Sequence, residues 1–179
     1  GTIPFYYAQL TELKNDIEPE ETSQWELPNK VLALSVTKEF NYDIKTLFYT
    51  TAHFEFRHQW QEGVKAIDQV SQYLPGIGTS HRCVLDSGQT VMYTSSFVYD
   101  PGQKIVFSET DKKKSSAVYF ILRPAGENKS IFTLELYLAS KITKFMFDLF
   151  MKKKMKGRLE RSLANLDHVL HDIRLPVEF

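Results

Sequence analysis

The fold is decided by residues 89–110, which read QTVMYTSSFVYDPGQKIVFSET. Two runs rich in β-branched and aromatic residues, 89–99 and 104–110, flank the turn signal Asp100-Pro101-Gly102. Such runs on either side of a short turn predict two strands that pair antiparallel. The turn also sets the register, because every second residue of both strands then shares a face. The pairs expected on one face are Tyr99 with Ile105, Phe97 with Phe107, and Ser95 with Glu109.

The same alternation of strand-like runs and turns extends on both sides of this hairpin. The predicted elements are a strand at 31–40, a helix at 44–52, a short helical turn at 54–60, strands at 64–70, 79–85, 89–99, 104–110, 116–123 and 131–139, and a helix at 142–173. Because the connections are short, consecutive strands should pair antiparallel. The last helix, roughly 45 Å long, is the only element long enough to cover the sheet. The order predicts an α+β fold, a curved seven-stranded antiparallel sheet wrapped around a long C-terminal helix.

Four motifs lie at the boundaries of these elements. Asp43-Ile44-x-x-Leu47-Phe48 opens the first helix, and Trp60-Gln61-Glu62-Gly63-Val64 leads into the second strand. Residues 78–83 (GTSHRC) begin the third strand, and residues 161–166 (RSLANL) lie late in the last helix. With the element order, they resemble the START-like, birch-pollen-allergen-like and polyketide-cyclase-like superfamily over about 31–173. The resemblance implies the helix-grip fold and an internal cavity for a small hydrophobic or lipid-like ligand.

The whole chain, including Phe5-Tyr6-Tyr7, also resembles the C-terminal half of a bacterial family whose N-terminal half looks like a nucleotide-cyclase domain. The chain begins Gly-Thr without Met, so we expect one domain of a longer protein, acting as a sensor or accessory domain. Residues 1–30 are expected to be an N-terminal extension with an acidic linker. Residues 31–179 are expected to be the ligand-binding domain.

Charge and cysteine content exclude several classes of protein. The net charge is +0 and the pI is about 7.1, which argues against a dedicated nucleic-acid binder. Cys83 is the single cysteine, so neither an intrachain disulfide nor a thiolate metal cluster can form, and a cytoplasmic setting is expected. No apolar run is long enough to span a membrane. The charges are nevertheless uneven: residues 1–28 carry six acids and one base, and residues 141–161 carry eight bases and two acids.

The expected cavity is lined by rings with a few polar groups, as small-molecule pockets usually are. On the strand 116–123, Ala117, Tyr119 and Ile121 should share a face with Phe132, Leu134 and Leu136. The candidate ligand-binding residues are Trp60, His81, Arg82, Tyr93, Phe97, Phe107, Glu109, Tyr119, Phe145 and Leu149. The competing interpretation is an ordinary filled core, which would favour a protein-interaction domain over a ligand-binding one.

Glu109 is the most informative single candidate, because a lone buried carboxylate is costly and needs a partner. The partners considered are Arg82, which the Ser87-Gly88 turn would pair with Tyr93, and His81, which a one-residue shift would bring there. A structural pair is expected. The alternatives are an ion pair that orients a ligand, or an acid–base pair of a cyclase- or dehydratase-type enzyme.

No catalytic motif, metal site or cofactor is predicted. His168 and His171 have metal-ligand spacing on a helix, but no further ligand supports them, so we expect solvated or capping residues. His53 and His58, which lie near Arg57, are expected at the surface. The sequence contains no nucleophile elbow, no phosphate-binding glycine loop and no paired-carboxylate motif.

The last helix changes character along its length. Residues 142–151 include seven apolar side chains around most of the circumference, and Lys152–Lys156 then contribute four lysines. Gly157 weakens the helix by roughly 1 kcal/mol relative to Ala. The apolar half could gate the cavity, dock a partner domain or touch a membrane with the lysines at the headgroups. We expect instead that both its faces are buried, one by the sheet and one by the acidic N-terminal segment.

Overall fold

The computed structural model describes residues 24–70 and 72–173, which form a seven-stranded antiparallel sheet with helices. The elements are β1 (Val31–Phe40), α3 (Ile44–Ala52), the 3₁₀ helix η1 (Phe54–Phe56), α4 (Arg57–Trp60), β2 (Val64–Asp68), β3 (Ser80–Leu85), β4 (Gly88–Asp100), β5 (Lys104–Asp111), β6 (Ser116–Pro124), β7 (Ser130–Leu138), α5 (Lys141–Phe150) and α6 (Lys152–Asp172). The predicted order is confirmed. Most of the predicted N-terminal extension, and the end of the chain, lie outside the described residues.

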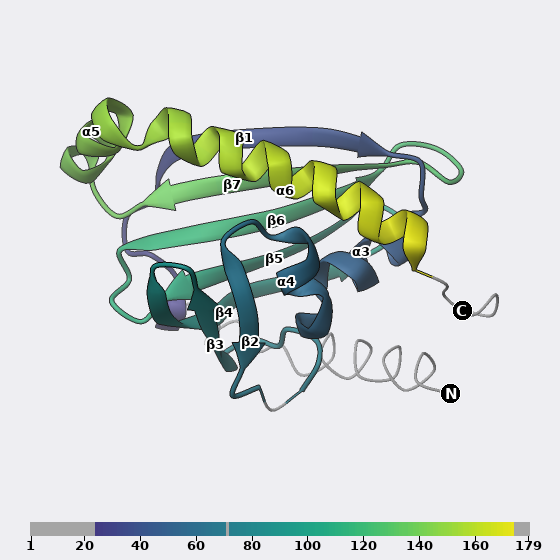
Figure 1. Cartoon of the computed structure of the whole chain (residues 1–179), viewed down its shortest axis with the longest axis horizontal. Coiled ribbons are helices and arrows are strands. Elements are labelled where there is room, and N and C mark those ends of the chain that lie inside the picture. Colours follow the sequence, from purple (N-terminus) through teal and green to yellow (C-terminus); the bar gives the residue numbers. More distant parts are fainter. Residues whose placement is uncertain (1–23, 71, 174–179) are drawn as a thin grey trace.

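Strands β2 to β7 form a meander in chain order, and β1 pairs with β7 at the edge of the sheet. Their order is β1-β7-β6-β5-β4-β3-β2, and each neighbouring pair is antiparallel, as predicted. Figure 1 shows α6 crossing one face of the curved sheet, with α3 and α4 on the same side. None of the described helices is both long and apolar enough to cross a bilayer.

The single helix predicted at 142–173 is wrong in one respect, because the structure divides it at Met151. The backbone of Met151 has φ −121° and ψ −24°, outside helical geometry. Backbone hydrogen bonds continue across this residue, from Met151 N–H to Phe147 and from Met155 N–H to Met151. The junction is therefore a kink between α5 and α6. Phe147 is the buried residue of α5, and it packs beside Leu34 of β1.

A bulge in β4 corrects the predicted register of the hairpin. Tyr99 pairs with Ile105 and Phe97 with Phe107, as predicted, but the register shifts between Thr94 and Ser96. Glu109 therefore pairs with Thr94, and the predicted pair with Ser95 is wrong. An extra residue turns every earlier side chain of the strand to the opposite face.

Tyr93 consequently lies on the outer face of the sheet, and its predicted place in the cavity is wrong. Its ring stacks on Trp25, with centroids 3.7 Å apart and planes 4° apart. Leu27, two residues after Trp25 in the sequence, is buried. Residues 24–30 thus include side chains that pack on the folded domain, and the domain boundary at residue 30 stays a prediction.

The face predicted for β6 is also wrong, by one residue. Val118 pairs with Leu136 and Phe120 with Leu134, so the even-numbered residues of β6 face inward. Tyr119 therefore points outward, where its hydroxyl accepts a hydrogen bond from Lys30 at 3.2 Å. Alternation alone could not distinguish the two faces, because both carry large apolar side chains.

The centre of the domain is filled with aromatic rings. Neighbouring rings of Phe97, Phe107, Phe120 and Phe132 have centroids 6.4, 4.4 and 6.3 Å apart in a row across β4, β5, β6 and β7. Trp60 contacts the last two rings edge-on. Phe97 and Phe107 are thus core residues that do not line a void, and their predicted place in the cavity is wrong.

Candidate ligand-binding site

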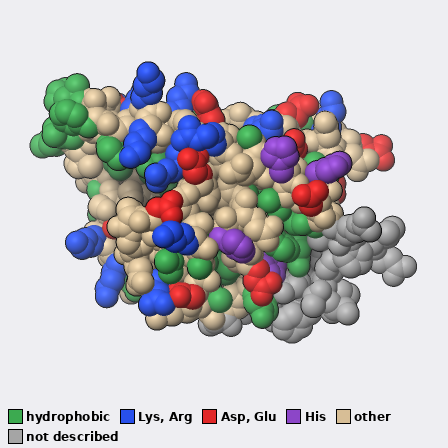
Figure 2. All heavy atoms as spheres, in the orientation of Figure 1, with side chains coloured by type: hydrophobic (Ala, Val, Ile, Leu, Met, Phe, Trp, Pro, Cys, Tyr) green, Lys and Arg blue, Asp and Glu red, His purple; other side chains and the backbone are tan. Residues whose placement is uncertain are grey.

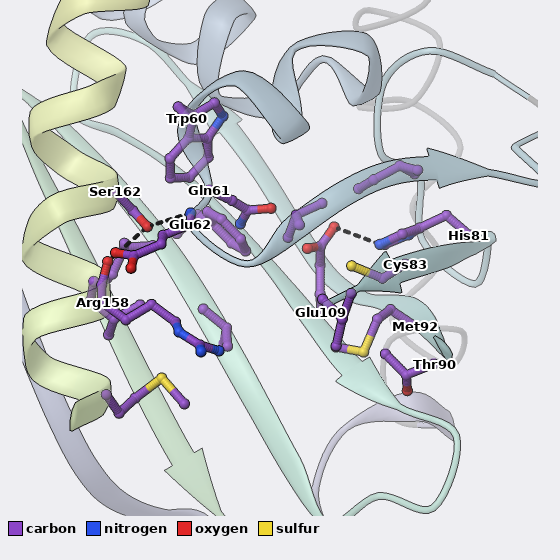
Figure 3. A pocket seen from close by; sticks show the side chains of 18 residues that line it. Trp60, Gln61, Glu62, His81, Cys83, Thr90, Met92, Glu109, Arg158 and Ser162 are labelled. Atoms are coloured by element: carbon purple, nitrogen blue, oxygen red, sulfur yellow. Dashed lines mark hydrogen bonds and ion pairs between the residues drawn. The ribbon is translucent and has the colours of Figure 1, made fainter. Parts of the chain in front are cut away.

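A pocket of about 220 Å³ lies between α6 and the inner face of the sheet. Its buried end includes Trp60, His81, Cys83 and Glu109. Its more exposed end includes half-buried residues of β4 and α6, such as Thr90 and Arg158. Figure 3 shows Glu109, His81 and Cys83 on the sheet side and Ser162 and Arg158 on the helix side. Most of the lining is apolar. Besides the residues named above, the pocket is lined by Gln61, Glu62, Val64, Ile67, Leu85, Met92, Val118, Phe120, Leu134, Met155 and Leu159.

Glu109 is held in the buried end by Arg57, a partner that the sequence did not predict. The Arg57 guanidinium donates from Nη1 to Oε1 at 2.9 Å and from Nη2 to Oε2 at 3.1 Å. The Arg57 side chain is 0% exposed and that of Glu109 is 6% exposed. This is a bidentate arginine–carboxylate pair, the geometry with the strongest charge-assisted hydrogen bonds.

The end of α3 explains why Arg57 can be buried. The chain turns sharply after Ala52, so that Arg57 Nε and Nη2 donate back to the Ala52 carbonyl, each at 3.3 Å. A cation at a helix C-terminus is stabilised by the helix dipole. The guanidinium also lies 5.1 Å from the ring centroids of Phe54 and Phe120, which supplies cation–π attraction in place of water.

His81 is the second polar neighbour of Glu109. Its Nε2 lies 3.6 Å from Oε2, a contact slightly longer than a hydrogen bond. Within the described residues, its buried Nδ1 has no hydrogen-bond partner. Of the two partners predicted for Glu109, His81 is present. The prediction of Arg82 as a partner is wrong, because Arg82 pairs with Val91 on the outer face and donates two hydrogen bonds to Asp68, each at 2.6 Å.

The protonation states follow from burial and from the neighbouring charges. Burial alone would raise the pKa of Glu109, but the charge and hydrogen bonds of Arg57 hold that pKa below its usual range. Burial lowers the pKa of His81, more than Glu109 raises it. Near neutral pH the buried end therefore holds a carboxylate, a guanidinium and a neutral imidazole. Burial also raises the pKa of the Cys83 thiol to about 11, so it stays protonated.

The helix side of the pocket is tied to the loop that follows α4. Glu62 N–H donates to Ser162 Oγ at 2.9 Å, and Arg161 Nε donates to Glu62 Oε2 at 2.6 Å. Gly63 adopts φ +86°, and a Cβ there would lie 3.3 Å from Arg158. Glycine at this position therefore permits the left-handed backbone, and its missing side chain leaves room for the Arg158 guanidinium.

The structure brings together three of the ten predicted site residues. Trp60, His81 and Glu109 line the pocket. Phe145 and Leu149 are exposed on α5, so their predicted place in the cavity is wrong, because Phe147 is the residue that this helix turns towards the sheet. The remaining five lie in the filled core or on the outer face, as described above.

The histidines outside the pocket divide into two groups. His58, His168 and His171 are exposed, as expected, whereas His53 is buried and its predicted surface position is wrong. Its Nδ1 accepts a hydrogen bond from Glu55 N–H, which closes the turn after α3. Among the residues that the structure describes, no three His, Cys, Asp or Glu side chains are grouped so as to hold a metal ion.

The sequence matches no protein-family model and no curated protein. Solved structures are similar in fold. KanY, determined by NMR, has a TM-score of 0.61 at 15% identity, over 80% of this chain and 99% of that one. A START superfamily protein from Mycobacterium smegmatis has a TM-score of 0.55 at 16% identity, over 80% and 100%. Norcoclaurine synthase from Thalictrum flavum, in complex with dopamine and hydroxybenzaldehyde, has a TM-score of 0.55 at 8% identity, over 89% and 95%.

The chain therefore has the helix-grip fold that these structures share, as the sequence predicted. At these identities the likeness concerns the fold alone. The nucleotide-cyclase-like partner half and the cytoplasmic setting stay predictions.

Proposed function

We propose that this chain binds a small, mostly apolar molecule that carries one hydroxyl or N–H group, in the pocket between α6 and the sheet. One observation carries the proposal. The Glu109 carboxylate, bound on one side by Arg57, lines the buried end of an otherwise largely apolar pocket. Sparse polar groups within an apolar lining are how proteins orient small ligands.

The size of the pocket narrows the class of ligand. About 220 Å³ is below the roughly 300–1,000 Å³ typical of sites for drug-sized molecules, and above the roughly 150 Å³ cavity that binds benzene. A molecule with one ring, or a short chain of similar volume, fits this space. A larger lipid would require the more exposed end, near Thr90 and Arg158, to open further.

The charges of the site favour a ligand that donates a hydrogen bond. A carboxylate offers about four lone-pair positions, and Arg57 occupies two of them. Arg57 also neutralises Glu109, so a neutral hydroxyl or N–H can bind without leaving a buried net charge. A hydrogen bond to a charged group contributes about 1.5–3 kcal/mol.

Paired ligands test this proposal. We expect p-cresol to bind at least about tenfold more tightly than p-xylene, which replaces the hydroxyl by a methyl group of similar size. Isothermal titration calorimetry measures both affinities, and native mass spectrometry of the purified protein would reveal a natural ligand that remains bound. Equal affinities for the two compounds would show that Glu109 does not take part in ligand recognition.

Two adjacent residues of β4 provide matched variants. Thr90 lines the pocket, whereas Val91 pairs with Arg82 on the outer face. Thr90→Trp should fill the space and abolish the binding of p-cresol, and Val91→Trp should leave the affinity unchanged. Binding that survives Thr90→Trp would place the ligand elsewhere.

An acid–base enzyme of the cyclase or dehydratase type is the second candidate. Its supporting observation is that Glu109 and His81, whose nearest polar atoms are 3.6 Å apart, both line the pocket. With the pKa of each group lowered, both are unprotonated near neutral pH, so either can accept a proton, as a weak base. Glu109→Gln should then abolish turnover of a substrate that still binds. Retained turnover in a folded Glu109→Gln variant would exclude this role.

A further inference from the structure

The helix α5 carries an apolar stripe that faces solvent. Ile142 is 79% exposed, Phe145 62% and Phe150 71%, and Met146 and Leu149 are also exposed. These five residues follow the spacing i, i+3, i+4, i+7, i+8, which in a globular domain normally marks the face that packs on the core. Here the core side is taken by Phe147, which is buried. The predicted burial of this second face is not seen, and the acidic N-terminal segment that was expected to cover it lies mostly outside the described residues.

The stripe is concentrated at one end of the molecule. Figure 2 shows hydrophobic side chains gathered where Figure 1 places α5, with lysine and arginine side chains beside them. Met151, at the kink, extends this exposed apolar surface, and the large hydrophobic residues exposed elsewhere in the described chain are only Leu32, Tyr73 and Val98. Contiguous exposed apolar surface of this kind marks an interaction site, whereas single exposed residues are ordinary.

Positive charge surrounds the stripe. Residues 141–156 contain six lysines and one acid, Asp148, so their net charge is +5. Asp148 is bound by Lys144 at 2.5 Å and approached by Lys152 at 3.9 Å. Lys141, Lys153 and Lys154 are exposed. Among the residues that the structure describes, these three lysines have no acidic partner. Apolar side chains next to such lysines match a surface that offers hydrocarbon and negative charge together.

We propose that α5 docks the domain on an anionic lipid membrane, with the stripe among the acyl chains and the lysines at the headgroups. A short helix with one strongly apolar face and flanking lysines binds the interfacial plane of a bilayer without crossing it. A second copy of the chain matches less well, because two faces of net charge +5 would repel. An acidic protein partner would satisfy the lysines, but a protruding helix of ten residues offers little of the surrounding flat surface that standard interfaces use.

Cosedimentation with vesicles tests this proposal. The probes are vesicles of phosphatidylcholine alone and vesicles of phosphatidylcholine and phosphatidylserine in equal parts. We expect the intact chain to bind the anionic vesicles at least about tenfold more tightly, and to lose affinity as salt is added. Equal binding to both kinds of vesicle, or binding to neither, would overturn the proposal.

Two pairs of variants separate the stripe from the lysines. Phe145→Ser with Phe150→Ser should reduce binding to anionic vesicles by more than about tenfold, because two large apolar side chains no longer enter the acyl region. Its control is Val98→Ser, at an exposed apolar residue on β4. Lys153→Glu with Lys154→Glu should reduce binding similarly, while Lys112→Glu with Lys113→Glu, on the exposed turn between β5 and β6, should have little effect.

Two outcomes would point to another occupant. If the Phe145/Phe150 variant binds vesicles as well as the intact chain, the stripe is not the docking surface. If the intact chain forms dimers in sedimentation equilibrium that this variant abolishes, the stripe is a self-association surface and the membrane proposal fails. All these side chains are exposed, so circular dichroism and the melting temperature should be unchanged in every variant.

Discussion

Arg57 and Glu109 lie 52 residues apart in the sequence and meet through two parallel hydrogen bonds, with almost no exposed surface on either side chain. The pair joins the turn after α3 to the inner face of β5. Each charge is stabilised by the other, so removing either one leaves the second buried without its partner.

Arg57→Met should therefore lower the free energy of unfolding by about 3–5 kcal/mol. Replacing both residues, Arg57→Met with Glu109→Met, should recover most of that loss, because no buried charge remains. Urea denaturation measures the three values. Lys65→Met, which removes an exposed ion pair with Asp86, is the control and should cost less than about 1 kcal/mol. Additive losses in the double variant would contradict the coupling of the pair.

The buried His53 should make stability depend on pH. Burial and the charge of Arg57 lower its pKa from 6.5 to about 4 in the folded state. The unfolded chain therefore binds a proton more readily, and stability rises with pH across this range. His53 leaves the free energy of unfolding undiminished above about pH 6.5. As the pH falls towards 4, its protonation in the unfolded chain lowers that free energy by at most about 3 kcal/mol.

The histidines on either side of the turn allow a direct comparison. His53→Gln should flatten the rise in unfolding free energy between pH 4 and pH 6.5, measured by urea denaturation at several pH values. His58→Gln, at an exposed position, should leave the rise unchanged. The same slope in both variants would assign the pH dependence to other groups, of which Glu109 and His81 are the nearest.

Cys83 should be almost unreactive in the folded protein. It is buried in the pocket, and its thiol has a pKa of about 11, so little thiolate forms at neutral pH. We expect Ellman's reagent to modify the folded chain slowly, at a rate set by opening of the structure, and the urea-unfolded chain at once. Because this is the single cysteine, the count of modified thiols is unambiguous. Rapid modification of the folded chain would contradict the burial.

Trp25 and Leu27 should contribute to the stability of the domain, although both lie in the segment that the sequence assigns to a linker. Loss of the ring stack on Tyr93 and of a buried leucine suggests that Trp25→Ala with Leu27→Ala lowers the unfolding free energy by about 2–5 kcal/mol. Val98→Ala, at an exposed apolar residue, is the control. An unchanged midpoint in urea would support a domain that begins at residue 31.

The element order was predictable because turn residues and changes of hydrophobic period mark nearly every boundary. The face of the sheet to which each strand residue points was harder to predict. The bulge at Ser95 inserts one residue without any Gly or Pro to reveal it, and it reverses the face of Tyr93. On β6, Tyr119 and Phe120 are equally plausible inward residues until the pairing with β7 is known.

The site was only partly predictable, because its charges come from distant segments. The sequence predicts that a buried Glu109 needs a partner, but the candidates it offers, His81 and Arg82, both lie on β3. Arg57 lies in a polar-looking stretch, and its burial follows from the sharp turn after Ala52, which tertiary structure alone reveals. A useful signal was nevertheless present: Arg57 stands among Phe54, Phe56 and Trp60, an aromatic setting unusual for a solvated arginine.

The extra residue at Ser95 divides β4 into two segments that contribute to different parts of the interior. Thr90 and Met92 on one side contribute to the pocket, and Phe97 and Tyr99 on the other contribute to the aromatic interior. Substitutions at 90 and 92 can therefore retune what the pocket accepts without disturbing the rings that hold the sheet together. A deletion of one residue here would turn Thr90 and Met92 outward and bring Val91 and Tyr93 to the inner face, so the number of residues at this point matters as much as their identity.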